Sequence, residues 1–260
     1  MYQIIKNVLA PKLTKDDGIN MENRSHMIMW SKCNFRCAFC LQSSKNFKAG
    51  SQHHSLSKDE YLAAILTLMQ SGKNFKFSGG EPTLNPRVEW DLQVVKELGG
   101  TVFFDTNGSN PEIVKNLLDK GLIDVLAVSF KGLNPEEALK TSNIKKQDFC
   151  WNNVFKTIEY GSETPGVKVI ITHVCYNDVS YEELLEFSAL IEPYKGVFYK
   201  INNLHKANSL PAELGLKRVD PDNLLNLLKR LTDEKPRWKD HVIYVDDDYG
   251  ISNYDGIVFL

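Results

Sequence analysis

The segment Trp30–Cys40 reads WSKCNFRCAFC and places three of the five cysteines of the chain within eight residues. It follows an apolar run, His26–Trp30, that predicts a β-strand. Three thiolates on one short loop suit a cuboidal iron–sulfur cluster, whose irons favour cysteine sulfur. Because no fourth cysteine is near in the sequence, one iron would stay open to a small-molecule ligand. The spacing predicts that Cys33, Cys37 and Cys40 are the catalytic, metal-ligating residues of such a cluster.

Zinc is the alternative metal for this segment. The three cysteines with His53 or His54 would complete a tetrahedral zinc site. The position of the cysteines directly after a strand favours the cluster. The two other cysteines, Cys150 and Cys175, stand alone and are expected to pack as small apolar groups.

Beyond the cysteines, the chain repeats a short apolar run, a polar helix start, an amphipathic helix and often a glycine. Strands are expected at 26–30, 75–78, 102–104, 123–130, 167–174, 197–201 and 241–245. Helices are expected to open at Ser57, Asn85, Asn110, Asn134, Ser180 and Asp220, where Ser, Asn or Asp caps the first turn. Strands that alternate with helices imply a parallel sheet with right-handed crossovers. The prediction is an α/β fold, a partial (β/α)6 TIM-like barrel with parallel strands.

The sequence shows no clear linker or second core. We expect a single domain over residues 1–260, with its core at about 26–235, a short N-terminal arm at 1–25 and a C-terminal extension at 236–260. The acidic run 246–248 is expected to be a solvated loop. With 42% hydrophobic and 25% charged residues, the chain can bury a substantial core.

The net charge of −2 offers no bulk attraction to nucleic acid or to an anionic membrane, and neither partner is expected. The sequence contains no stretch of about 18 apolar residues, so we expect no membrane-spanning segment. Without a secretion signal at the N-terminus, we expect a cytoplasmic protein, in which clustered cysteines bind metal more often than they form disulfides.

A second motif, Ser78-Gly79-Gly80-Glu81, closes the second strand of the core. In a fold of this class, functional residues lie at the carboxyl ends of the strands. Two adjacent glycines allow the backbone to approach a ligand closely.

Together, the Cys-x3-Cys-x-aromatic-Cys motif and the Gly-Gly-Glu motif resemble those of the radical S-adenosylmethionine (SAM) superfamily. The resemblance implies that the open iron of a [4Fe–4S] cluster binds the amino and carboxylate groups of SAM. One electron then breaks a C–S bond and yields a 5′-deoxyadenosyl radical. It also implies that Phe39 packs near the adenine and that Gly79-Gly80-Glu81 binds the amino group, with Glu81 supporting the loop.

The later strand ends refine this resemblance. Asp105-Thr106-Asn107-Gly108 is similar to the branch that activates glycyl radical enzymes, although a simple turn would also suit it. Activating enzymes commonly carry Asp-x-Lys after the next strand, where the Asp helps to bind a cation. Here Ser129 replaces the Asp and Lys131 is kept. Lys131 is expected at the carboxylate or ribose of SAM, or in solvent.

Histidine follows at the next two strand ends. His173 and His205 are expected to face the ribose or the substrate, or to be structural, and Asn202 and Asn203 lie beside the same strand end. The predicted cofactor-binding residues are Phe39, Ser78, Gly79, Gly80, Glu81, Asp105, Asn107, Ser129, Lys131 and His173.

Three functions follow from these residues. The slightly favoured one is abstraction of hydrogen from a glycine of a partner glycyl radical enzyme. The second is direct action on a peptide or small molecule, and the third is a zinc-stabilised binding module without redox chemistry. As a radical SAM enzyme, the chain would need an electron donor such as flavodoxin or ferredoxin, and a protein or peptide substrate is possible.

Overall fold

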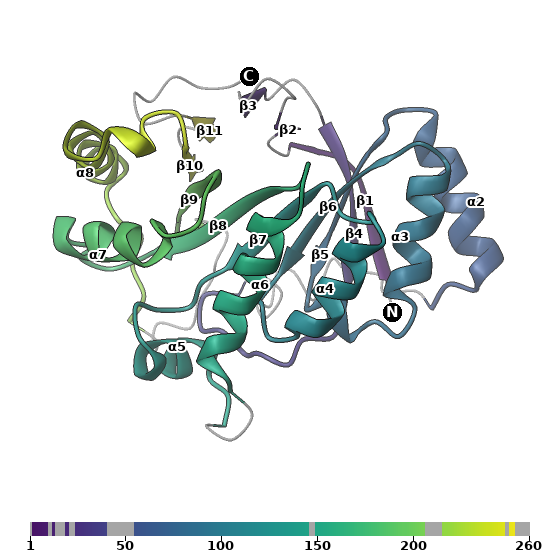
Figure 1. The fold of residues 1–260 in the computed structure, drawn as a ribbon, viewed down its shortest axis with the longest axis horizontal. Helices are drawn as coiled ribbons and strands as arrows, with labels where there is room; N and C mark the ends of the chain where they lie inside the picture. The colour runs from purple at the N-terminus through teal and green to yellow at the C-terminus, as the bar shows by residue number, and fades with distance from the viewer. Residues whose placement is uncertain are drawn as a thin grey trace. The chain divides into compact units, whose positions relative to one another are not determined.

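The computed structural model describes residues 2–9, 12–13, 19–20, 24–40, 55–145, 149–205, 215–247 and 250–252. The chain forms two compact units. The first comprises Met1–Asn34, Gly50–Val128 and Asn152–Val169, and the second comprises Phe35–Ala49, Ser129–Trp151 and Ile170–Leu260. Strands and helices alternate along the chain as the sequence predicts (Figure 1). Whether residues 1–260 act as a single domain stays a prediction. In the described part of the chain, no helix has the length and apolar character that crossing a membrane requires.

The first unit contains a sheet in which most strands are parallel. Its strands, adjacent in this order, are β1 (Tyr2–Leu9), β4 (Arg24–Trp30), β5 (Asn74–Gly79), β6 (Thr101–Thr106) and β7 (Val125–Ser129). Strands β4 to β7 pair in parallel, and β1 pairs antiparallel to β4. The expected N-terminal arm therefore adds a strand to the sheet. Two short strands, β2 (Lys12–Leu13) and β3 (Ile19–Asn20), pair separately.

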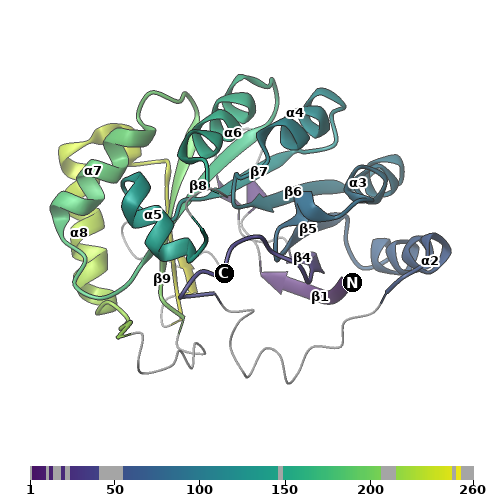
Figure 2. The ribbon, with the colours of Figure 1, turned by 90° about the horizontal axis from the view of Figure 1, so that it is seen from below.

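The helices of the first unit lie on one side of strands β4 to β7 (Figure 2). They are α2 (Lys58–Met69), α3 (Val88–Glu97), α4 (Pro111–Asp119) and α6 (Trp151–Glu163), and a 3₁₀ turn, η2 (Pro82–Leu84), follows β5. Side chains alternate between the two faces of a strand. Phe75 and Phe77 of β5 are at most 5% exposed. Lys76 and Ser78 therefore point to the opposite face.

The second unit contains β8 (Lys168–Cys175), β9 (Val197–Asn203), β10 (Val242–Asp246) and β11 (Gly250–Ser252), adjacent in this order. Its helices are α5 (Pro135–Ser142), α7 (Tyr181–Ile191) and α8 (Pro221–Glu234), followed by the 3₁₀ turn η5 (Pro236–Trp238). The predicted C-terminal extension thus supplies two strands, β10 parallel to β9 and β11 antiparallel to β10. Phe130, Phe187, Tyr199 and Trp238 form an aromatic core.

Most predicted helix starts are confirmed. Ser57 and Glu60 form the complete capping box before α2. Asn134, Ser180 and Asp220 each accept a hydrogen bond from the backbone N–H three residues later. Each of these bonds satisfies an N–H group that the first turn of a helix leaves free.

Two predicted asparagine caps do not form. Helix α3 begins at Val88, and Asn85 instead accepts from the Arg87 N–H and donates to Asp91. Asn110 precedes α4 as expected, but its side chain donates to the Thr83 hydroxyl at 2.7 Å. Neither side-chain amide caps its helix, because each hydrogen-bonds instead to a buried polar side chain, Asp91 for Asn85 and Thr83 for Asn110.

The sequence reading also missed helix α6. Its buried residues, Val154, Thr157, Ile158 and Gly161, follow the three- and four-residue spacing of a helical face. This pattern was available in the sequence.

Candidate functional site

The Gly79–Glu81 turn fixes the backbone just before Cys33. The Gly80 N–H donates to the Trp30 carbonyl at 2.6 Å, and the Glu81 N–H donates to the Lys32 carbonyl at 2.7 Å. Gly79 has a φ of 100°, in the region that favours glycine. A Cβ atom on Gly80 would lie 2.0 Å from the Lys32 carbonyl oxygen. In this structure, the two glycines permit the close approach of two backbone segments.

Glu81 lies buried beneath this turn, with 0% of its surface exposed. Its Oε1 accepts from the Thr83 N–H and from the hydroxyls of Thr83 and Thr106, and its Oε2 accepts from the Asn107 N–H at 2.7 Å. Burial raises the pKa of Glu81, while these hydrogen bonds oppose the rise. Glu81 therefore ties the end of β5 to the end of β6, while its role in binding S-adenosylmethionine stays a prediction.

Asn107 places a side-chain amide beside Cys33. Its Nδ2 donates to Asn34 Oδ1 at 2.9 Å and lies 3.9 Å from the Cys33 sulfur. Its Oδ1 accepts from the Ser109 N–H, which holds the amide in place. An N–H group directed at a cysteine sulfur stabilises negative charge there and is one way in which proteins tune iron–sulfur clusters.

Cys37 is held by the end of α5. The Arg36 N–H donates to the Ser142 carbonyl at 2.8 Å, and the Cys40 N–H donates to the Cys37 carbonyl at 3.1 Å. Burial raises the pKa of the Cys37 thiol, and the positive charge of Lys131 opposes this rise. Lys131 therefore favours the thiolate form, which is the form that binds metal.

By residue type, the three cysteines of the segment suit an iron–sulfur cluster, because its irons favour thiolate sulfur. In the described part of the chain, Cys33, Cys37 and Cys40 form no disulfide, and Cys33 is exposed, Cys37 buried and Cys40 intermediate. Cys33 belongs to the first unit and the other two to the second. Among the residues that the structure describes, no group of three His, Cys, Asp or Glu side chains lies in position to hold a metal ion. The alternative zinc ligands, His53 and His54, fall outside the described residues.

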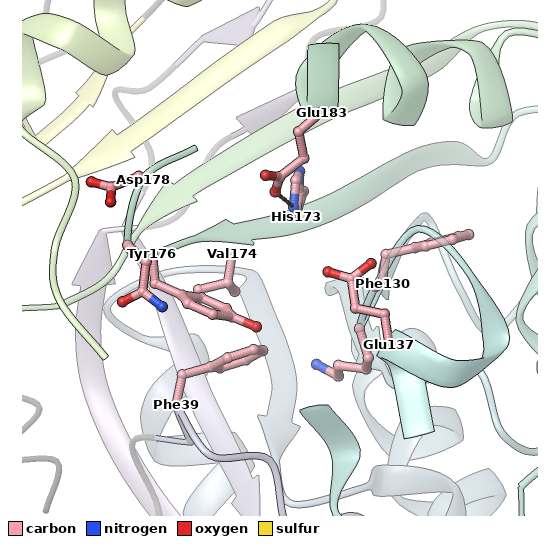
Figure 3. Close-up of a pocket in the computed structure, with 11 residues that line it drawn as sticks. Phe39, Phe130, Glu137, His173, Val174, Tyr176, Asp178 and Glu183 are labelled. Carbon is pink, nitrogen blue, oxygen red and sulfur yellow. Dashed lines mark ion pairs between the residues drawn. The ribbon is translucent and has the colours of Figure 1, made fainter. Parts of the chain in front are cut away.

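The second unit contains a pocket of about 210 Å³ (Figure 3). The rings of Phe39 and Tyr176 lie together on one wall, with their centroids 5.7 Å apart, and the Lys131 ammonium lies 5.3 Å from the Phe39 ring centroid. The carboxylates of Glu137 and Glu183 lie on the other side of the pocket (Figure 3). The structure therefore brings Phe39 and Lys131 together with His173, which also lines the pocket.

His173 is held in a single environment at the edge of this pocket. Its Nδ1 lies 3.0 Å from the Tyr199 hydroxyl, and its Nε2 lies 3.6 Å from Glu183 Oε1. The ring stacks on Phe187 with a centroid distance of 4.4 Å. Burial lowers the pKa of His173 to about 4, so the imidazole is neutral at pH 7. Burial and the charge of Glu137 raise the pKa of Glu183.

We expect His173 to make the cluster-free chain sensitive to acid. Since its pKa is about 4 in the folded state and 6.5 in the unfolded state, the unfolded chain binds the additional proton between these values. Stability should fall by about 3 kcal/mol as the pH is lowered from 7 to 4, and this contribution should level off below pH 4. Urea unfolding at a series of pH values measures the loss. His173→Gln should flatten the profile, and His205→Gln, at a less buried position, should not. Equal profiles for the wild type and both variants would contradict this expectation.

Asp105 and Ser78 lie together, and a lysine that the sequence analysis did not select accompanies them. Asp105 Oδ2 accepts from the Ser78 hydroxyl at 2.9 Å and lies 2.9 Å from Lys76 Nζ. The alternation of Phe75 and Phe77 with Lys76 and Ser78 was the available signal. The remaining predicted residue, Ser129, ends β7 and is partly buried.

The structure corrects two expectations. Asp246, the first residue of the acidic run, is 3% exposed and accepts hydrogen bonds from Asn203 at 2.7 Å and from Arg218 at 2.8 Å. It is therefore a buried, paired residue and not part of a solvated loop. Asp247 pairs with His205, while residue 248 lies outside the described part. Cys175 is buried as expected, but Cys150 is exposed.

Comparison with known proteins gives a family and several relatives. The family model described as "Radical SAM superfamily" matches residues 27–191, which is more than half of the chain. An S-adenosylmethionine-dependent nucleotide dehydratase from Lacinutrix mariniflava is 29% identical over 201 residues, covering 73% of this chain and 40% of the relative. A Methanocaldococcus jannaschii protein, named as a candidate glycyl-radical-enzyme activating enzyme, is 30% identical over 145 residues, covering 50% and 58%.

Solved structures agree on the fold. SuiB from Streptococcus suis, bound to its precursor peptide SuiA, has a TM-score of 0.64 at 17% identity, covering 85% of this chain and 48% of SuiB. SuiB has also been solved with bound S-adenosylmethionine. The predicted α/β class, with a partial TIM-like barrel, is thereby confirmed. The chain spans 40% to 58% of the two relatives above, whose names point to different activities.

Proposed function

This chain belongs to the radical SAM superfamily, and on that premise we propose that Cys33, Cys37 and Cys40 hold the cluster at which S-adenosylmethionine is cleaved. A [4Fe–4S] cluster and S-adenosylmethionine are the cofactors of this family. When bound, the cluster supplies the electron that breaks the C–S bond and releases a 5′-deoxyadenosyl radical. The supporting observation is that the backbone before Cys33 is clamped by the Gly80 and Glu81 N–H groups.

In this proposal, the chain orients the cysteine segment from both of its ends. Asn107 directs an amide at the Cys33 sulfur and stabilises its thiolate. Lys131 provides positive charge near Cys37. The buried carboxylate of Glu81 holds Thr106 and the Asn107 backbone, so that the amide of Asn107 keeps its position.

We assign the pocket of the second unit to one part of S-adenosylmethionine. Its volume of about 210 Å³ is below the ~300–1,000 Å³ that is typical of a complete small-molecule site. Phe39 and Tyr176 offer aromatic rings on which the adenine can stack. Lys131 can bind the carboxylate, and the carboxylates of Glu137 and Glu183 can accept from hydroxyl or amine groups.

For the hydrogen donor, the geometry favours direct action on a small polar molecule. Asp105, which suggested an activating enzyme, is engaged by Lys76 and Ser78. Thr106 and Asn107 are explained by their bonds to Glu81. Ser129 stands where activating enzymes commonly carry an Asp, which also weighs against that branch.

A glycine of a partner enzyme is the second candidate, because the Methanocaldococcus jannaschii relative is 30% identical. The peptide-bound SuiB structure, in turn, supports a peptide as the alternative substrate for direct action. We keep flavodoxin or ferredoxin as the proposed electron donor and a cytoplasmic location, where thiols stay reduced.

Anaerobic reconstitution tests the proposed function. We expect brown protein with about four iron atoms per chain, and 5′-deoxyadenosine released on reduction with S-adenosylmethionine. A colourless protein with one zinc ion would overturn the cluster assignment. Deuterium that enters 5′-deoxyadenosine from a labelled small molecule would support direct action. Label that comes from a protein glycine would instead support activation of a partner enzyme.

A further inference from the structure

Lys76 and Asp105 form a charged pair, with Lys76 Nζ 2.9 Å from Asp105 Oδ2, on the face of β5 opposite to Phe75 and Phe77. Strand β5 alternates buried Phe75 and Phe77 with Lys76 and Ser78. In the strand register, Lys76 lies opposite Met27 of β4 and Phe103 of β6. Residues that are opposite one another in register share a face, so the charged pair is set among apolar side chains.

The geometry leaves hydrogen-bonding groups available at this pair. Among the described residues, Lys76 and Ser78 both bond to Asp105 at its Oδ2, each at 2.9 Å. The Lys76 ammonium also lies 4.8 Å from the Phe103 ring centroid. An ammonium has three N–H donors. Within the described residues, Asp105 is the acceptor for Lys76, so two N–H groups of Lys76 and the Oδ1 of Asp105 remain for a ligand.

Stability alone does not account for this pair. The side chains of Lys76 and Asp105 are only 12% and 26% exposed, and removing charges from water costs free energy that an ion pair often fails to recover. The Lys96–Asp124 pair of the same unit offers a contrast. Asp124 also accepts from the Val102 N–H, so that pair joins α3 to β6. Within the part of the chain that the structure describes, the side chains of Lys76 and Asp105 make no bond of that kind to the backbone.

Strand β5 connects Lys76 to the turn that holds the backbone before Cys33. Lys76 is four residues before Gly80, a distance of about 13 Å along a strand. The Gly80 N–H bonds to the Trp30 carbonyl, three residues before Cys33. A small molecule bound at Lys76 would therefore lie on β5, about 13 Å along the strand from the turn that holds the backbone before Cys33.

We propose that Lys76 binds the anionic group of the substrate, a carboxylate or a phosphate, and that Asp105 orients the ammonium and accepts a hydroxyl or amine of the same molecule. The inference rests on the proposed function, which supplies the radical that this substrate meets. It assigns a specificity-determining role to a residue outside both the cysteine segment and the pocket of the second unit.

Anion binding to the cluster-loaded chain with S-adenosylmethionine present tests this site. The probes are succinate, for a carboxylate, and inorganic tripolyphosphate, for a phosphate, and calorimetry gives each dissociation constant. We expect one probe to bind, and Lys76→Met to weaken it about tenfold or more, since a charge-assisted hydrogen bond is lost. Lys76→Arg should keep most of the affinity. Lys96→Met is the matched control and should bind the probe as the wild type does.

Several outcomes would overturn the site. The site is wrong if neither probe binds the wild type, or if Lys76→Met binds the probe as tightly as the wild type does. A parallel loss of affinity for S-adenosylmethionine would place Lys76 on that cofactor instead. Should Lys76→Met fail to fold, Lys76→Arg and the Lys76→Met/Asp105→Leu variant, which replaces both charges by apolar groups, decide the question. Release of 5′-deoxyadenosine without either probe is measured separately, so failure of the proposed function is distinguishable from failure of this site.

Discussion

Replacing Cys37 with alanine should abolish cluster binding and reduce the release of 5′-deoxyadenosine to background. Loss of an outer hydrogen-bonding partner at a metal site typically costs 10- to 100-fold, so loss of a ligand should exceed about 100-fold. The Cys37 side chain is buried and small, so alanine should leave the surrounding fold intact. Iron content and the visible absorbance of the reconstituted protein measure cluster binding, and chromatography of 5′-deoxyadenosine measures cleavage.

Cys150 supplies the matched control. It is a free and exposed cysteine outside the Trp30–Cys40 segment. Cys150→Ala should keep both the iron content and the cleavage activity. If Cys37→Ala also kept about four iron atoms and normal cleavage, the cysteine segment would be misassigned.

Replacing Gly80 with alanine should destabilise the chain and lower its iron content together. The new Cβ would lie 2.0 Å from the Lys32 carbonyl oxygen and 2.5 Å from its carbon. Backbone atoms cannot move aside as the end of a flexible side chain can, so we expect a loss of about 3 kcal/mol or more in the free energy of unfolding. Displacement of Lys32 would also displace Cys33. Denaturant unfolding of the cluster-free chain and iron analysis after reconstitution measure the two effects.

The Gly99→Ala variant is the control that distinguishes the local clash at Gly80 from the general effect of an added methyl group. It has a φ of 76°, but nothing lies within 4 Å of a Cβ built on it. Gly99→Ala should therefore cost about 1 kcal/mol, from the left-handed backbone, and should leave iron content unchanged. If the two variants lost equal stability and both kept their iron, the proposed clamp on the cysteine segment would be wrong.

The sequence was sufficient for features that depend on local patterns. Most of the order of strands and helices followed from apolar periodicity, although α6 and the strands β1 and β11 did not. The starts at Ser57, Asn134, Ser180 and Asp220 followed from the chemistry of helix caps. The cysteine spacing indicated the family, and the family model that covers residues 27–191 confirmed it. These signals need only neighbouring residues, because a helical turn or a strand edge is built within a few positions of the chain.

The hydrogen-bond partners of polar side chains could not be predicted from local sequence patterns. Asn85 was predicted to cap a helix, but Asp91 and the Arg87 N–H compete for its side chain. The acidic run at 246–248 was predicted to be solvated, but Arg218 and Asn203 reach Asp246 from other parts of the second unit. In each case, the outcome was determined by a group that only the folded chain brings near.

The sequence by itself therefore determined the superfamily, the α/β class and the three cysteines that we propose as cluster ligands. Only the tertiary structure determined which partners the polar residues of β5 and β6 bind. Glu81 meets Thr106 and Asn107, which are 25 and 26 positions away, and Lys76 meets Asp105 on the neighbouring strand. The physical reason is register, since parallel pairing of β5 with β6 fixes which side chains stand opposite one another. That choice depends on the packing of the whole unit and not on the residues adjacent in sequence.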